Sequence, residues 1–482
     1  MSDAKTEAYL AAWKAAEEAA ETMGPIIGGL YRDHGIVIIV YGISLVGQTP
    51  IQVIKTHRKA RRLEKDIGVS DSLKIVQSIA RRGLAPTRID VGHFSHEFSQ
   101  LGKDADLEKF LDGQFAKIGP GGKPLREEPK DIVLYGFGRI GRLLARILIE
   151  KTGGGDKFRL RAIVVRKGAP GDLKKRASLL RYDSVHGSFK GTIEIDEEEN
   201  ALVINGNLVR VIYSAAPEET DYAKYGIKDA VVLDNTGIWR DREGMGRHLK
   251  SGGVSHVILT APGKGDIPNI VFGVNHNTVD SDERLLSAAS CTTNAIVPVL
   301  KVISDKFGIE NGHMETCHSY TNDQNLIDNY HPKERRGRGA PLNMVLTETG
   351  AAKAVSKAIP ELAGKLTGNA IRVPTPNVSL AVLNLNLENE TDKETVNAFL
   401  RATALDSALQ AQVDYTQSTE VVSSDFVGNS HAGIVDSYAT ITHGKRCVLY
   451  VWYDNEYGYS AQVVRLLQHI SKVAPPNFPA ID

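Results

Sequence analysis

The sequence predicts an α/β protein built around a doubly wound parallel sheet. Between residues 131 and 260, apolar runs of strand length alternate with polar segments; the runs are DIVLY, FRLRAIVV, AVVLD and VSHVILT. Such continuous apolar runs are typical of parallel strands that are buried on both faces. A glycine turn at 136–141 follows the first run directly and leads into an apolar helical pattern, LLARILIE. The alternation and the turn together predict strand–helix–strand units in one sheet.

Length and composition bound the rest of the chain. At 482 residues, with 42% hydrophobic and 24% charged residues, we expect two or three globular domains. Lys+Arg and Asp+Glu both number 58, so the net charge is zero and nucleic-acid binding is not expected. Three cysteines are too few for a disulfide framework. Neither a signal peptide nor an apolar stretch of bilayer length is visible, so we expect a soluble, cytoplasmic protein with no membrane partner.

The sequence patterns within residues 1–130 predict a separate, mainly helical region. An Ala- and Glu-rich segment at 4–23 and the pattern SDSLKIVQSIARRG at 70–83 both favour helices. We interpret the basic run Arg58–Arg62 as a solvated helix face; an acidic partner or phosphate is the alternative. The segment 118–130 is rich in Gly, Pro and charge and marks a linker. These patterns indicate no function for residues 1–130.

The glycine turn indicates a Rossmann-type dinucleotide site. Gly136, Gly138 and Gly141 form G-x-G-x-x-G between a strand and a helix. The first glycine permits the turn, the second lets the backbone approach a pyrophosphate, and the third allows close helix packing. The helix N-terminus adds positive potential. Because strand, turn and helix occur in the required order, we expect dinucleotide binding rather than an ordinary glycine turn.

The end of the second strand predicts which dinucleotide is bound. An acidic residue commonly stands there and binds the adenosine ribose hydroxyls. In this chain Arg166 and Lys167 follow RLRAIVV. Two cations attract a 2′-phosphate that a carboxylate would repel, so NADP is favoured over NAD. The alternative is a solvated basic turn.

A cysteine at a predicted helix start is a candidate nucleophile. Cys291 lies in SCTTN, just before the helical pattern AIVPVLKVISDKFG, where unpaired N–H groups stabilise a thiolate. His318, in HSYTND, is a candidate base for that thiol. Spacing alone does not pair one cysteine with one of 14 histidines. A buried structural cysteine is therefore the alternative.

Seven strings occur in one order: YGFGRIGR, RYDSVHG, SCTTN, HSYTNDQ, TGAAKAV, RVPTPNVS and WYDNEYGYS. From residue 131 to about 473, this order closely resembles the phosphorylating glyceraldehyde-3-phosphate dehydrogenase family; residues 1–130 lie outside the resemblance. It implies a dinucleotide-binding domain at 131–290, completed by 454–482. It also implies an α+β catalytic domain with a large mixed sheet at 291–453, and a homotetramer.

The resemblance also assigns roles to single residues. It implies that Cys291 is the nucleophile, that His318 is the base and that Asn455 bonds the nicotinamide amide. With the two cations after the second strand, the cofactor-side positions are Gly136, Phe137, Gly138, Arg139, Ile140, Gly141, Arg166, Lys167, Thr236, Gly237, Thr260, Asn455 and Tyr459. Two anion sites, for the substrate's C3 phosphate and for inorganic phosphate, comprise Ser290, Thr292, Thr321, Asp323, Arg336, Thr349, Gly350 and Arg372. No metal site is expected.

Three places depart from the family pattern. Tyr135 stands where Asn is usual, Arg166-Lys167 replaces Asn-Asp, and Asn329-Tyr330 replaces a Leu-Pro pair that crowds the ribose in NAD-preferring members. The last two changes favour a cofactor with a 2′-phosphate. The implied reaction converts D-glyceraldehyde 3-phosphate, phosphate and NAD(P)+ to 1,3-bisphosphoglycerate and NAD(P)H, reversibly, through a Cys thiohemiacetal and thioester. An erythrose-4-phosphate dehydrogenase and a regulatory or scaffold protein led by residues 1–130 are the alternatives.

Overall fold

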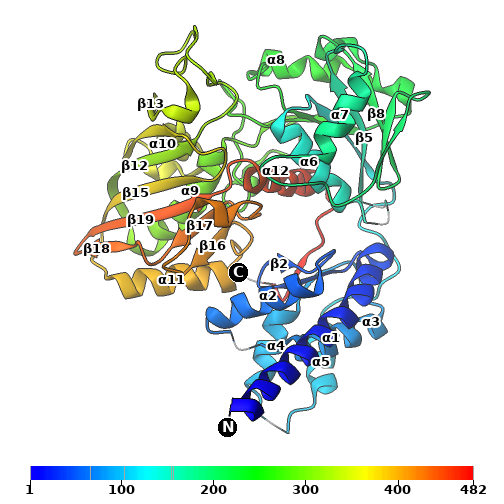
Figure 1. Cartoon of the computed structure of the whole chain (residues 1–482), viewed down its shortest axis with the longest axis vertical. Helices are drawn as coiled ribbons and strands as arrows, with labels where there is room; N and C mark the ends of the chain where they lie inside the picture. Colours follow the sequence, from blue (N-terminus) through cyan, green and yellow to red (C-terminus); the bar gives the residue numbers. More distant parts are fainter. Residues whose placement is uncertain (1, 66, 103, 154, 156, 481–482) are drawn as a thin grey trace.

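The computed structural model describes residues 2–65, 67–102, 104–153, 155 and 157–480. Figure 1 shows three parts: an N-terminal region, a parallel-sheet domain that begins at residue 130, and a mixed-sheet domain that begins at residue 291. No helix of the described residues is both long and apolar enough to cross a membrane. Short 3-10 helices lie at Pro217–Glu219, Tyr222–Tyr225, His248–Lys250, His276–Thr278, Ala340–Leu342, Pro360–Leu362 and Ser423–Phe426.

The parallel-sheet domain confirms the predicted doubly wound sheet. Its strands follow the order β11-β10-β9-β4-β5-β8-β7-β6, with β6 and β7 antiparallel to their neighbours and the other strands parallel. The chain order reverses at β4, which pairs with both β5 and β9, and the glycine turn follows β4 directly. The strands are β4 (Lys130–Tyr135), β5 (Phe158–Val165), β6 (Ile193–Asp196), β7 (Ala201–Ile204), β8 (Asn207–Tyr213), β9 (Ala230–Asp234), β10 (Val254–Leu259) and β11 (Leu285–Ser287). The helices are α6 (Arg139–Glu150), α7 (Asp172–Arg181), α8 (Arg242–Gly246) and the later α12 (Tyr457–Ile470), which packs on α6.

The mixed-sheet domain confirms the second sheet. Its strands follow the order β13-β14-β12-β15-β19-β17-β16, and β18 pairs with β19. The pairs β12–β14 and β16–β17 are parallel, whereas the other pairs are antiparallel. The strands are β12 (Ile309–Ser319), β13 (Val345–Glu348), β14 (Leu366–Val373), β15 (Ser379–Leu387), β16 (Val413–Thr416), β17 (Gly433–Asp436), β18 (Ile441–His443) and β19 (Arg446–Tyr453). The helices are α9 (Cys291–Phe307), α10 (Ala351–Ala358) and α11 (Lys393–Asp406).

The N-terminal region is mainly helical, as predicted, but it also contains a small sheet that the sequence patterns did not indicate. Its elements are α1 (Ser2–His34), β1 (Val37–Val40), β2 (Ile43–Ser44), α2 (Pro50–Arg62), α3 (Val69–Arg82), β3 (Arg88–Asp90), α4 (Val91–Ser99) and α5 (Leu107–Phe115). The sheet order is β2-β1-β3-β20, and β20 (Asn477–Phe478) comes from the end of the chain. The ring of Phe478 lies 5.6 Å from that of Phe94. The segment 454–482, expected to complete the dinucleotide-binding domain, is therefore divided between α12 and this sheet.

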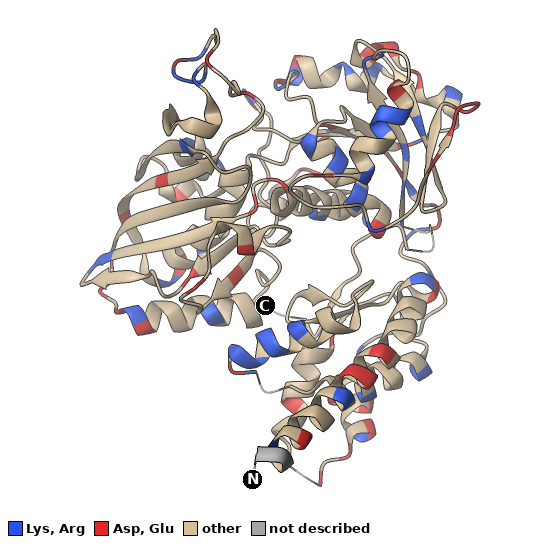
Figure 2. Ribbon diagram, in the orientation of Figure 1, with Lys and Arg blue, Asp and Glu red and all other residues tan. Residues whose placement is uncertain are grey.

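The N-terminal region also packs on the mixed-sheet domain, and α2 carries much of the contact. Lys59 Nζ lies 2.6 Å from both carboxylate oxygens of Asp414, whose side chain is 7% exposed. Figure 2 shows the positions of Lys and Arg, in blue, along the ribbon of α2. Leu63 and Leu405 line one narrow cavity beside this pair. The interpretation of the basic run as a solvated face is therefore wrong for Lys59.

The Lys59–Asp414 pair predicts a stability effect. Burial acts to raise the pKa of Asp414, but Lys59 and His431 outweigh it and hold this pKa below its usual range. Lys59→Met should lower the free energy of unfolding by about 1–2 kcal/mol near neutral pH, because a buried carboxylate loses its partner. Since the folded pKa is depressed, this contribution is present above the unfolded value of about 3.9 and is lost as pH falls below it. Urea denaturation of the wild type and Lys59→Met, near neutral pH and again below about pH 3.9, measures the difference in the free energy of unfolding.

A matched control comes from α3. Lys74 pairs with Asp71 at 3.2 Å, but both side chains are about 60% exposed, at 62% and 60%. Lys74→Met should therefore change the free energy of unfolding by less than about 0.5 kcal/mol. Equal losses in the two variants would show that the Lys59–Asp414 pair does not stabilise the contact.

Candidate functional site

The turn before α9 fixes the position of Cys291. Ala289 has φ +56°, a left-handed conformation that residues with a side chain rarely adopt. The buried hydroxyl of Tyr459 donates to the Ala289 carbonyl at 3.0 Å and so ties this turn to α12. Ser290 then caps α9, because its Oγ accepts from the N–H of Thr293 at 3.0 Å. Cys291 is thus the first residue of the helix, where N–H groups have no intrahelical partner.

The structure brings Cys291 and His318 into contact. Cys291 Sγ lies 3.4 Å from His318 Nε2, where the end of β12 meets the start of α9. On the other side of the ring, His318 Nδ1 lies 2.7 Å from the Ser319 carbonyl oxygen. Arg372, opposite His318 in the parallel neighbour β14, donates to the same carbonyl at 2.9 Å. Arg372 Nη1 also lies 2.8 Å from His318 Nδ1. In the tautomer whose Nδ1–H donates to the Ser319 carbonyl, Nε2 is the acceptor that faces the thiol.

Burial favours the neutral forms of both side chains. It raises the pKa of the Cys291 thiol, while Arg372 and a hydrogen bond from Thr292 act in the opposite direction. Burial, followed by the charge of Arg372, lowers the pKa of His318 to about 3. Near neutral pH the imidazole is therefore an uncharged base beside a thiol. It can take the thiol proton as the sulfur attacks an electrophile.

Several predicted anion-site residues form a chain next to this pair. Arg372 Nη1 lies 3.4 Å from Thr321 Oγ1, and Thr321 in turn donates to Asp323. Asp323 also pairs with Arg336. Nε of Arg372 is buried without a hydrogen-bond partner among the described residues. An unpartnered buried N–H is costly, so its position fits an anion that is bound beside Arg372.

The other four anion-site residues lie at two helix starts. At α9, Ser290 caps the helix, and Thr292 Oγ1 lies 2.9 Å from the buried hydroxyl of Tyr453. At α10, Gly350 is the N-cap residue, and Thr349 Oγ1 accepts from the backbone of the helix at 3.2 Å. The hydroxyl of Thr292 thus already has a structural partner. The sequence string WYDNEYGYS contains Tyr453, but nothing in its pattern indicated this contact.

The glycine turn fits a bound pyrophosphate. Gly136 has φ +94°, and a Cβ there would lie 3.1 Å from Thr236. A Cβ on Gly141 would lie 2.4 Å from the carbonyl oxygen of Gly136. Around Gly138, the N-cap of α6, no described atom lies within 4 Å of such a Cβ. The first and third glycines therefore allow close packing, and the second leaves room in front of the helix N-terminus. Phe137 is buried and Ile140 packs against the same core.

The side chain of Arg139 ties the glycine turn to α12. Its Nε and Nη2 donate to the two carboxylate oxygens of Glu456, and its Nη1 pairs with Asp183. Glu456 follows Asn455, whose Oδ1 accepts from the hydroxyl of Ser379 at 2.8 Å. The two ends of the predicted cofactor site are thus linked by one ion-pair network. Sequence reasoning missed Glu456 and Asp183, although both lie in the strings YDNEYGYS and RYDSVHG.

The remaining cofactor-side residues lie at the carboxyl ends of the parallel strands. Thr236 Oγ1 donates to Asp234 at 2.7 Å, Gly237 has φ +65°, and Thr260 Oγ1 donates to the Asp234 carbonyl at 3.1 Å. Tyr135 is buried, and its ring lies 4.8 Å from that of His248. The edge of the sheet where these residues lie is where ligands bind in doubly wound folds.

Arg166 and Lys167 are both exposed at the end of β5, next to the glycine turn. Neither forms a salt bridge with another described residue, and Lys167 Nζ lies 5.9 Å from the centre of the Tyr213 ring. The Asn329-Tyr330 pair lies in the segment between β12 and β13, with Tyr330 87% exposed. The two cations are therefore available to an anionic ligand.

Comparison with known proteins identifies related chains. Residues 130–242 match the NAD binding domain of glyceraldehyde 3-phosphate dehydrogenase, and residues 290–455 match its C-terminal domain. A "glyceraldehyde-3-phosphate dehydrogenase-like protein" of Pseudomonas aeruginosa (strain UCBPP-PA14) is 57% identical over 460 residues, which cover 95% of this chain and 100% of that protein. The glyceraldehyde-3-phosphate dehydrogenase of Ogataea parapolymorpha is 43% identical over 346 residues, 71% of this chain and 99% of the relative. Glyceraldehyde-3-phosphate dehydrogenase 2 of Trichormus variabilis is 39% identical over 343 residues, 71% of this chain and 98% of the relative.

The geometry predicts that Cys291 is the most reactive of the three thiols. Burial raises the pKa of all three thiols, that of Cys447 to about 11, but among the described residues only Cys291 has a cation, Arg372, that acts in the opposite direction. The sulfur of Cys291 has an imidazole and a helix N-terminus beside it. Iodoacetamide should therefore label Cys291 at least about tenfold faster near neutral pH. Timed labelling followed by peptide mass spectrometry measures the three rates, and equal rates would contradict the prediction.

Proposed function

Because this chain belongs to the glyceraldehyde-3-phosphate dehydrogenase family, we propose that it catalyses the reversible oxidation and phosphorylation of D-glyceraldehyde 3-phosphate to 1,3-bisphosphoglycerate. The observation that carries the proposal is the 3.4 Å contact between Cys291 Sγ and His318 Nε2, with Arg372 beside it. NAD or NADP, bound at the glycine turn, supplies the hydride acceptor for this chemistry.

The covalent steps follow from the positions of Cys291 and His318. His318 Nε2 takes the thiol proton as Cys291 Sγ bonds to the aldehyde carbon, and returns it to the oxygen to give a thiohemiacetal. It accepts that proton again as the carbon is oxidised to a thioester. Phosphate then attacks the thioester carbon, so that the acyl phosphate forms and the Cys291 sulfur leaves. The N–H groups at the start of α9 can stabilise negative charge on the reacting oxygen.

The charged residues near the pair support a phosphorylated substrate. Arg372 and Arg336 provide guanidinium groups, and Thr321 adds a hydroxyl between them and Asp323. Guanidinium groups bind phosphate oxygens through paired, charge-assisted hydrogen bonds. The buried Nε of Arg372, which lacks a described partner, supports an anion at this point. A regulatory role led by residues 1–130 alone would leave this arrangement without a purpose.

The activity predicts a clear loss on substitution of Cys291. Cys291→Ser should lower turnover by at least about three orders of magnitude, because a serine hydroxyl is far less ionised than a thiol. Cys317→Ser is the matched control and should keep most of the activity. Initial rates with and without phosphate measure both. A Cys291→Ser enzyme with near-normal turnover would contradict the proposal, and a higher kcat/KM with erythrose 4-phosphate would assign the alternative substrate.

We further propose that NADP is used at least as well as NAD. The supporting observation is that Arg166 and Lys167 are exposed and form no salt bridge with a described residue at the end of β5. Two partly solvated cations can favour a 2′-phosphate by about 1–3 kcal/mol, which is a factor of about 5 to 150 in specificity. The alternative remains a solvated turn that the cofactor does not touch.

The cofactor proposal predicts the effect of one charge reversal. Lys167→Asp should tilt kcat/KM toward NAD by at least about tenfold, because a carboxylate repels the 2′-phosphate and binds ribose hydroxyls. The control is Lys224→Asp, which reverses the charge of an exposed lysine in the 3-10 helix Tyr222–Tyr225. Steady-state kinetics with both cofactors give the ratio for each protein. A wild-type enzyme that prefers NAD more than about tenfold, with a ratio unchanged in Lys167→Asp, would overturn the proposal.

A further inference from the structure

A cavity of ≈ 270 Å³ lies between the N-terminal region and the two sheet domains. Its walls include β2, β3, the C-terminal end of α6, the face of α12 and the segment that leads to β20. Figure 1 shows the segment after α12, in red, running from the parallel-sheet domain to the N-terminal region near β2. Part of this wall lies outside the residues that match the dehydrogenase family models.

Positive charge dominates the described residues that line this cavity. Four are cationic: Arg88 in β3, Arg465 in α12, and Lys151 and Lys157 in the segment between α6 and β5. Glu150 is the single carboxylate among these described lining residues, and burial raises its pKa, which disfavours its charged form. Among the described lining residues, cations therefore outnumber carboxylates.

Neutral groups hold these cations in place. Arg88 Nη2 donates to the Gly42 carbonyl at 2.7 Å, and Arg465 Nη1 donates to the Ser430 carbonyl at 2.9 Å. Lys157 Nζ lies 4.0 Å from the centre of the Tyr31 ring. None of Arg88, Lys151 and Arg465 forms a salt bridge with a described residue, and the Nε of Arg88 is buried without a described partner. The side chains of Arg88 and Arg465 are thus held by neutral groups, and Arg88, Lys151 and Arg465 have no carboxylate partner among the described residues.

The mutual repulsion of these groups is strong. Burial, and then the charges of Arg465 and Arg88, lower the pKa of Lys151 to about 8. Burial and Arg88 lower the pKa of Arg465 to about 9. Buried charges are normally paired, so the convergence of Arg88, Lys151 and Arg465, none with a described carboxylate partner, favours the binding of an anion.

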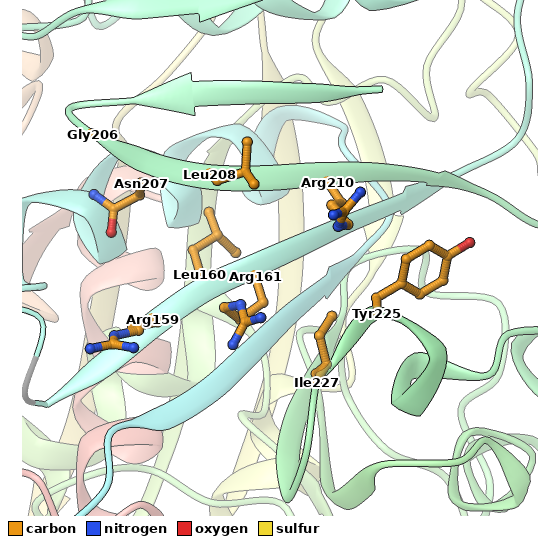
Figure 3. Close-up of a pocket in the computed structure, with 9 residues that line it drawn as sticks. All are labelled: Arg159, Leu160, Arg161, Gly206, Asn207, Leu208, Arg210, Tyr225 and Ile227. Atoms are coloured by element: carbon orange, nitrogen blue, oxygen red, sulfur yellow. The ribbon is translucent and has the colours of Figure 1, made fainter. Parts of the chain in front are cut away.

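A second arginine-lined pocket, on the outer face of β5 and β8, provides a contrast (Figure 3). There Arg161 pairs with Asp131 at 3.1 Å, and Arg210 pairs with Glu199. Arg159 is exposed and donates to the Gly155 carbonyl at 2.9 Å. Two of the three arginines in this pocket therefore already have a carboxylate partner. In the cavity at the N-terminal region, Arg88, Lys151 and Arg465 have no such carboxylate partner among the described residues.

We propose that the cavity lined by Arg88, Lys151, Lys157 and Arg465 binds a small metabolite with two or more negative charges, carried by phosphate or carboxylate groups. Its volume of ≈ 270 Å³ suits a small metabolite and is just below the usual lower limit of about 300 Å³ for drug-sized ligands. None of these four residues belongs to the catalytic or cofactor-side positions. The proposed site is thus made of residues other than those assigned to catalysis and cofactor binding.

Calorimetric titration of the full-length protein tests the proposal, with pyrophosphate and citrate as separate probes and the dinucleotide present at saturation. Lys151→Gln and Arg465→Gln should each weaken one binding event by at least about tenfold. Arg159→Gln, which removes a cation from the contrasting pocket, should leave that event unchanged. Arg372→Gln should also retain it, which separates this site from the catalytic anion sites. Tighter binding of pyrophosphate than of citrate would indicate a ligand with phosphate groups, and the reverse would indicate a ligand with carboxylate groups.

Thermal unfolding gives a second readout that does not depend on heats of binding. Lys151→Gln should raise the Tm of the protein without added anion, because one of four like charges is removed. Pyrophosphate or citrate should then raise the Tm of the wild type more than that of Lys151→Gln. The proposal is overturned if both probes bind wild type, Lys151→Gln and Arg465→Gln equally, or if neither probe binds the wild type.

Discussion

The contact between the first residue of α9 and the last residues of β12 is the constraint on which the site depends. Both neighbours of β12 pair with it over most of its length, and β14 places Arg372 directly opposite His318. A register slip of one residue would turn His318 to the other face of the sheet. The position of Cys291 depends on α12, because Tyr459 holds the strained turn at Ala289. The parallel-sheet domain, through α12, and the mixed-sheet domain, through β12, thus together determine the distance between Cys291 Sγ and His318 Nε2.

The N-terminal region is built into this arrangement. The end of the chain supplies β20 to its sheet, and Lys59 reaches Asp414 in the mixed-sheet domain. Helix α6 runs from the glycine turn to the cation-lined cavity, and α12 runs from Asn455 past the same cavity. The Arg139–Glu456 pair joins the starts of these two helices. An anion in the cavity would therefore lie beside both helices that begin at the predicted cofactor-side residues.

Local patterns predicted the parts of the structure that depend on local chemistry. Apolar runs indicated the strands at 131–260, and the glycines indicated the turn, because both signals lie within a few residues of sequence. The pairing of β20 with β3 could not be predicted, since a strand of two residues carries no period and its partner lies in another domain. The contact of Lys59 with Asp414 was missed for a related reason: charges on a helix look the same whether water or a carboxylate faces them.

The electrostatics of the site also connect substrate binding with the chemistry of His318. Arg372 contributes to lowering the pKa of His318, and its buried Nε has no partner among the described residues. An anion bound to Arg372 would offset that positive charge, so the pKa of His318 would rise toward its ordinary value. The imidazole would then be a stronger base when a phosphorylated substrate is present than when it is absent. Under the proposed function, the same guanidinium would thus bind the substrate and adjust the base, because its Nη1 lies 2.8 Å from His318 Nδ1.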